Sequence, residues 1–115
     1  MSLYDQIEFL EFFDTEYFID AEAKIVKYSI SINKVFLFEL YISTYDQYAA
    51  LTLKFNDWEN FIFDVDMQNL KNIKLDKSRL GFIYLNFYKE EITEPIAIVL
   101  LQPTISLSCG AGQSC

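Results

Sequence analysis

The side chains best suited to chemistry in this sequence are carboxylates around its single tryptophan, Trp58: Asp57, Glu59, Asp64 and Asp66. Asp64 and Asp66 are two residues apart, so on a β-strand both would project from the same face. Two such oxygen ligands could hold Ca²⁺ or Mg²⁺, or act as an acid and base pair. The simpler interpretation is a solvated strand face that charge protects from edge-to-edge pairing. Because this spacing is common by chance in a chain with 17 acidic residues, we predict no metal site.

Other residue types that catalysis commonly requires are missing. The sequence has no histidine, which removes the usual general base, the Ser-His and Cys-His nucleophile pairs and the commonest metal ligand. Its three glycines form no phosphate-binding loop. Cys109 and Cys115 fall in a tail of small residues and are too few to form a zinc site without histidine. We therefore expect a protein that is not an enzyme, with no catalytic residues and no cofactor.

The charge balance indicates the class of partner. Seventeen acidic residues against nine basic ones give a net charge of −8, which argues against nucleic acid or an anionic membrane and favours a basic protein. The basic segment 71–79 is interrupted by Asp76 and is interpreted as a solvated connection. No apolar run is long enough to span a membrane as a helix, and the N-terminus lacks the pattern of a secretory signal. A cytoplasmic location is expected.

Three aromatic side chains near predicted turns are candidates for partner contacts: Tyr45, Tyr48 and Trp58. Turns lie at the surface, and large rigid rings anchor interfaces at a small cost in entropy. The alternative is that these rings pack in the core or on a sheet face. With Asp57, Glu59, Asp64 and Asp66 as a polar rim, they form the predicted partner-binding set.

The length of 115 residues predicts one domain over residues 1–108, followed by a flexible tail over 109–115. Near the N-terminus, apolar residues at steps of three and four predict a short helix over about residues 2–14 with one apolar face: Leu3, Ile7, Leu10, Phe13 and Tyr17. A strand over residues 7–13 is the alternative.

From Lys24 onward the apolar pattern alternates with period two, which is typical of strands with one buried face. The alternation predicts strands over 24–32, 35–44, 49–56, 61–66, 80–89 and 96–101, and the short segments near 73–75 and 105–107 could add a brief strand. Turns are expected at 33–34 and 45–48, and a short helical turn within 67–72. We count about six or seven strands in hairpin order, so the predicted class is mainly β: an antiparallel sandwich or a strongly curved sheet.

In overall size, acidity and the carboxylate cluster near Trp58, the chain resembles the immunity proteins that bacteria make against contact-dependent growth inhibition toxins and related nuclease toxins. The resemblance implies a single cognate toxin domain, bound tightly and inhibited by covering its active or functional surface. A nuclease is basic where it meets phosphate, so an acidic partner would be attracted to it over a long range. Two alternatives stay open: a structural subunit that forms a homodimer through an exposed strand edge, and a small metal-binding domain that uses Asp64 and Asp66.

Overall fold

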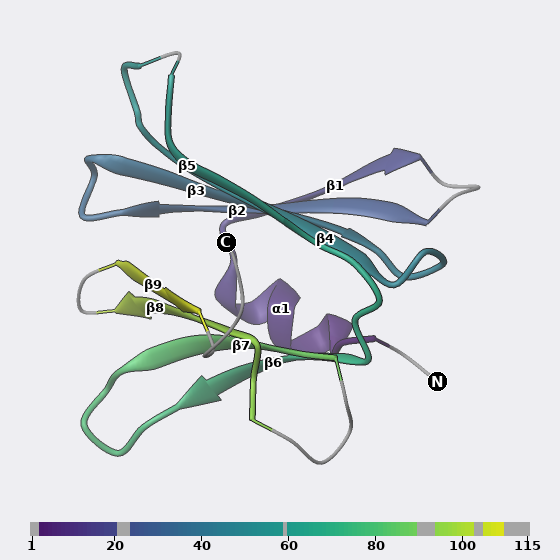
Figure 1. Ribbon diagram of the computed structural model, residues 1–115. Helices are drawn as coiled ribbons and strands as arrows, with labels where there is room; N and C mark the ends of the chain where they lie inside the picture. The colour runs from purple at the N-terminus through teal and green to yellow at the C-terminus, as the bar shows by residue number, and fades with distance from the viewer. Residues whose placement is uncertain (1–2, 21–23, 59, 90–93, 103–104, 110–115) are drawn as a thin grey trace. The chain divides into compact units, whose positions relative to one another are not determined.

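The computed structural model describes residues 3–20, 24–58, 60–89, 94–102 and 105–109. The chain forms two compact units: residues 6–69 make the first, and residues 1–5 together with 70–115 make the second. Over the described residues there are nine strands in two antiparallel sheets and one short helix near the N-terminus (Figure 1). The mainly β, antiparallel fold is thus confirmed, with more strands than the six or seven expected. One domain over residues 1–108 stays a prediction.

The sheet of the first unit is a meander in which every strand pairs with its neighbour in sequence. Its strands are β1 (Thr15–Asp20), β2 (Ile25–Ile32), β3 (Phe36–Ser43), β4 (Tyr48–Phe55) and β5 (Phe61–Met67). Asn33 and Lys34 both have positive φ (55° and 60°), and the Val35 N–H donates to the Ile32 carbonyl at 3.1 Å. Such a two-residue turn matches the twist of the paired strands. The predicted turn at 33–34 is therefore confirmed.

One face of this sheet, called here the core face, carries the apolar side chains of the predicted alternation. Val26, Tyr28, Ile30 and Ile32 of β2 are all buried, and the residues aligned with them across the sheet continue the pattern on β3, β4 and β5. Helix α1 (Gln6–Phe12) contributes Phe9, whose ring centroid lies 5.4 Å from that of Tyr28 in an edge-to-face arrangement. The helix therefore belongs to the core of the first unit.

The predicted apolar face is wrong within the helix itself. Ile7 is 71% exposed and Leu10 is also exposed, whereas Phe9, which lies off the predicted face, is fully buried. Leu3 and Phe13 of the predicted face are buried, and both lie just outside the helix. Positions 9 and 13 are four residues apart and meet with their ring centroids 5.6 Å apart. Two phenyl rings bury more apolar area than an isoleucine and a leucine, and they pack on Tyr28, so packing set the rotation of this seven-residue helix.

Two further segments differ from the sequence-based expectation. Residues 15–20 form β1, which no clear alternation in the sequence signals, and which pairs with β2 through an irregularity near Phe18 and Asp20. No helical turn forms within 67–72, where Asn69 has a φ of 59° that an α-helix does not allow. β1 is therefore established by its pairing with β2, and the left-handed backbone at Asn69 rules out the expected helical turn.

The second unit contains a four-stranded meander: β6 (Asn72–Lys77), β7 (Ile83–Tyr88), β8 (Ala97–Gln102) and β9 (Ser106–Cys109). The carbonyl of Leu3 accepts a hydrogen bond from the Ile73 N–H at 2.9 Å, which ties the N-terminal segment to β6. The first residue of the expected tail, Cys109, lies in β9, and residues 110–115, including Cys115, lie outside the described residues. Within the described chain, no helix has the length and apolarity needed to cross a membrane.

The strand expected over 80–89 begins three residues late. Gly81 has a φ of +85°, and the Phe82 N–H donates to the Ser78 hydroxyl at 3.0 Å, so residues 78–82 form a closed turn before β7. Leu80, expected in the strand, is 82% exposed in that turn. The alternation of apolar residues continues through the turn, which is why the pattern alone placed the strand boundary too early.

Candidate functional site

The second face of the five-stranded sheet, called here the polar face, carries hydroxyl, charged and tyrosine side chains. Its residues include Lys27, Ser29, Glu39, Tyr41, Thr52, Asp64 and Asp66. The register aligns one row across all five strands, in the order Thr15, Ser29, Glu39, Thr52 and Asp64. Antiparallel pairing places the side chains of such a row within reach of one another. Strand pairing therefore assembles on one surface residues that are up to 49 positions apart.

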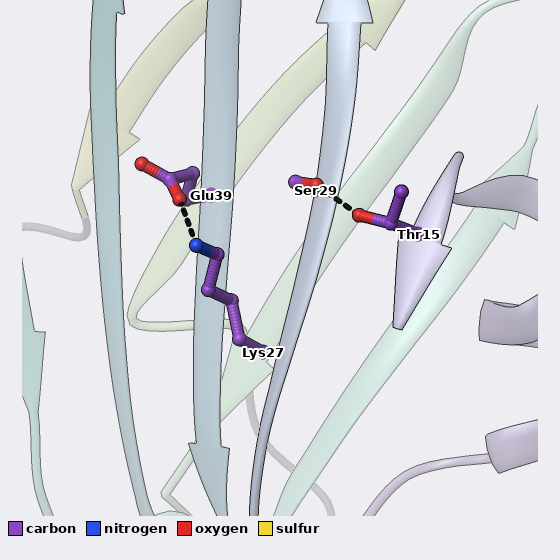
Figure 2. Close-up of polar contacts among 4 residues, drawn as sticks. All are labelled: Thr15, Lys27, Ser29 and Glu39. Carbon is purple, nitrogen blue, oxygen red and sulfur yellow. Dashed lines mark hydrogen bonds and ion pairs between the residues drawn. The ribbon is translucent and has the colours of Figure 1, made fainter. Parts of the chain in front are cut away.

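Near the middle of the polar face, Lys27 and Glu39 form an ion pair, with Nζ and Oε2 2.7 Å apart (Figure 2). Their side chains are 25% and 10% exposed, respectively. The hydroxyls of Thr15 and Ser29 are hydrogen-bonded on the same face. The ion pair neutralises the centre of the sheet. Asp64 and Asp66 of β5, an edge strand, add two negative charges to this face, and Lys54 of β4 adds one positive charge.

We expect Lys27→Met to lower the free energy of unfolding by about 1–3 kcal/mol, because it leaves a largely buried Glu39 carboxylate without its counter-charge. The double variant Lys27→Met/Glu39→Gln should be more stable than the single variant, since it removes both charges. Urea denaturation measures both effects, with the exposed Lys77→Met as the control. A single variant as stable as that control would contradict the structural role of the pair.

Two hydrogen-bonded pairs, Tyr48 with Asp66 and Ser43 with Asp46, lie at the end of the polar face that carries the β3–β4 turn. Burial raises the pKa of the Tyr48 phenol, and the nearby charge of Asp66 and its hydrogen bond with Tyr48 raise it further. The Ser43 hydroxyl donates to Oδ2 of Asp46 at 3.1 Å and accepts from the Asp46 N–H at 3.3 Å. The raised pKa keeps the Tyr48 phenol protonated, as a hydrogen-bond donor.

A pocket of about 460 Å³ opens at this same end. Its described lining residues are Ile25, Tyr41, Ser43, Asp46, Tyr48, Gln68 and Asn69. Tyr41 and Ser43 are two apart on β3, and Tyr48 lies opposite Ser43 on β4, which explains why their side chains meet. We name this set of lining residues the tyrosine pocket. It supplies two aromatic rings and several oxygen atoms, and its described residues include no lysine or arginine.

At the opposite end of the sheet, several apolar side chains are exposed around Trp58. Trp58 itself is 58% exposed and packs edge-on against Phe55, with the ring centroids 5.1 Å apart. Val35, Phe61 and Ile62 are exposed as well, and we name these four exposed residues the apolar tip. A second pocket of about 410 Å³ is lined there by Lys34, Val35, Phe55, Asn56, Asp57 and Trp58. Exposed aromatic and aliphatic side chains in a group are typical of protein-binding surfaces.

The structure divides the predicted partner-binding residues into two groups. One group lies at the β3–β4 turn or beside it and consists of Tyr45, Tyr48 and Asp66, with Asp64 nearer the middle of β5. The other group, Asp57 and Trp58, follows β4 at the other end of the sheet (Figure 1). Tyr45 is 78% exposed. Glu59 lies outside the described residues. As predicted from their spacing, Asp64 and Asp66 share one face, and Ile62 of the apolar tip precedes Asp64 by two residues.

Sequence reasoning did not identify Val35, Phe61 and Ile62 as surface residues. A signal was present, because Phe61, Ile62 and Phe63 are consecutive and a strand with one buried face cannot bury all three. The pairing shift between Leu53 and Lys54 of β4 also disturbs the regular alternation at Phe61. Over the residues described, no three side chains of metal-ligating type gather into a cluster.

Comparison with known proteins gives one informative match. No family model matches the sequence, and no curated protein matches it. One chain of a contact-dependent growth inhibition toxin–immunity protein complex from Klebsiella pneumoniae 342 is similar in structure, with a TM-score of 0.69. The match covers 96% of this chain and 98% of that chain at 17% sequence identity. The resemblance indicated by size, acidity and the carboxylates therefore extends to the three-dimensional fold of a chain from a toxin–immunity complex.

Proposed function

We propose that this protein is an immunity protein, which neutralises a cognate toxin domain by covering that domain's functional surface with the polar face and the apolar tip. The observation that carries the proposal is the grouping of Tyr48, Asp64 and Asp66 on one surface of a fold found in a toxin–immunity complex. The absence of histidine and the net charge of −8 favour the immunity role over the toxin role.

The electrostatic contribution comes from β5. Asp64 and Asp66 are exposed on the polar face, nearby Lys27 is already paired with Glu39, and Lys54 balances only one of the two carboxylates, so a positive surface on the partner meets net negative charge at this edge. A nuclease toxin is basic where it meets phosphate, and carboxylates can occupy positions that phosphates would take. Complementary charge mainly accelerates association and selects the partner.

A single interface can include both groups of residues. From Tyr48 to Phe55, β4 spans about 24 Å at the usual rise per residue. An ordinary interface covers about 800 Å² on each partner, which corresponds to a patch about 30 Å across. Ile62 of the apolar tip and the two carboxylates are all exposed on β5, so the acidic residues and the apolar tip lie along the same edge strand.

The test is co-purification with the toxin domain encoded beside the gene, followed by measured binding kinetics. We expect Asp64→Lys to slow association about tenfold and to reduce its dependence on salt, because the reversal opposes electrostatic attraction. The matched control is Glu11→Lys, which makes the same change in net charge on α1 at an exposed position. Unchanged kinetics for Asp64→Lys, or equal slowing by both variants, would reject the proposed electrostatic role of this face.

A further inference from the structure

The tyrosine pocket, described above, has a lining suited to one kind of ligand. Two tyrosine rings, Tyr41 and Tyr48, come from adjacent strands, and the negative faces of such rings attract cations. Asp46 supplies a carboxylate, and Gln68 and Asn69, which also line the pocket, carry side-chain amides with carbonyl oxygens. A volume of about 460 Å³ is within the range of sites that take a small ligand or a single large side chain.

A cation already lies against one of these rings. Nζ of Lys27 is 5.8 Å from the ring centroid of Tyr41, within the distance at which a cation and an aromatic ring attract each other. The charge of Lys27 is compensated by Glu39, so it opposes the entry of a second cation only weakly. The carboxylates of Asp46 and Asp66 both lie at this end of the polar face, and Asp66 is hydrogen-bonded to Tyr48.

We infer that the tyrosine pocket receives an arginine side chain of the protein partner, with the guanidinium group against the tyrosine rings and its N–H groups directed to Asp46. The inference rests on the proposed function, because it names the chemical group that the toxin domain would present here. Arginine fits better than lysine for two reasons: its planar guanidinium stacks on aromatic rings, and its five donors are arranged in a fork that matches a carboxylate and nearby carbonyl oxygens.

The first experiment uses the isolated protein and a small probe, N-acetyl-arginine amide, followed by ¹⁵N chemical shifts. We expect millimolar binding, with shift changes concentrated at Ser43, Asp46, Tyr48 and Asn69. N-acetyl-citrulline amide has nearly the same shape without the charge and should bind at least about fivefold more weakly. Equal binding of both probes, changes that map elsewhere, or no change at the solubility limit of the arginine probe would overturn the inference.

Two variants locate the probe within the pocket. Asp46→Asn removes the carboxylate and Tyr48→Leu removes a ring, so each should weaken binding of the arginine probe at least about fivefold. Glu11→Gln on α1 also removes one negative charge, and it should leave binding unchanged. Because Asp46 also closes the β3–β4 turn through Ser43, thermal unfolding of each variant checks that the fold is retained. Equal weakening by Asp46→Asn and Glu11→Gln would indicate non-specific charge attraction and would reject the site.

A second experiment separates this inference from the proposed function. Arginine residues of the toxin domain are replaced singly by glutamine, and each variant is combined with Asp46→Asn in a double-mutant cycle. One arginine should show a coupling of at least about fivefold in affinity. If the toxin domain binds and no arginine is coupled, the inference fails and the immunity function stands. If the probe occupies the pocket and the toxin domain does not bind, the function fails and the cation site stands.

Discussion

Replacing Phe9 with alanine is expected to lower the free energy of unfolding by about 3–5 kcal/mol, the usual cost of removing a fully buried phenyl ring. Phe9 is 0% exposed and lies with its ring centroid 5.4 Å from Tyr28 and 5.6 Å from Phe13. These contacts join α1 to the core face, so their loss leaves a cavity and frees the helix. Since whole domains are stable by only about 5–15 kcal/mol, urea denaturation should show a large shift of the midpoint.

The matched control for this prediction lies on the same helix. Ile7 is largely exposed, so Ile7→Ala should change the free energy of unfolding by less than about 0.5 kcal/mol. Phe9→Leu keeps part of the buried volume and should fall between the two alanine variants. If Phe9→Ala and Ile7→Ala lower the free energy of unfolding equally, the helix does not pack through Phe9. The apolar face predicted from the sequence would then describe the helix better than the structure does.

Replacing Trp58 with alanine is expected to weaken binding of the cognate toxin domain by about 30-fold to 1,000-fold, which corresponds to about 2–4 kcal/mol. Trp58 is the most exposed aromatic residue of the apolar tip, and tryptophan is among the residues that most often dominate an interface. The effect on stability should be small, because more than half of its surface is already in water. Calorimetric titration of the complex measures the affinity, and this prediction depends on the proposed immunity function.

Trp58 also provides its own spectroscopic signal, because it is the single tryptophan of the chain. Formation of the complex with a tryptophan-free toxin domain should shift its fluorescence emission to shorter wavelength as the ring leaves water. Ile7→Ala removes an exposed apolar side chain on α1 and should leave affinity unchanged. Tight binding without a change in emission would place Trp58 outside the interface and would leave the polar face as the binding surface.

Much of the fold was predictable because β-strands with one buried face have a simple signature. Val26, Tyr28, Ile30 and Ile32 alternate with polar residues, and the same period continues into β3, so the strands and their hairpin turn follow from local sequence. β1 was missed because its sequence shows no such alternation, and its pairing with β2 establishes it as a strand. The rotation of α1 was mistaken because the spacing of apolar residues does not reveal which of two faces has the better-fitting partner.

The composition alone determined that this protein is acidic, lacks histidine and carries an excess of aromatic residues, and the local alternation determined its mainly β class. The spacing of Asp64 and Asp66 was sufficient to place both carboxylates on one face. Only the tertiary structure decided which residues accompany them, since strand pairing brings Ile25, Gln68 and Asn69 from distant parts of the chain to the pocket lined by Tyr41 and Tyr48. The reason is that register depends on contacts between strands, and no local stretch of sequence contains both partners of such a contact.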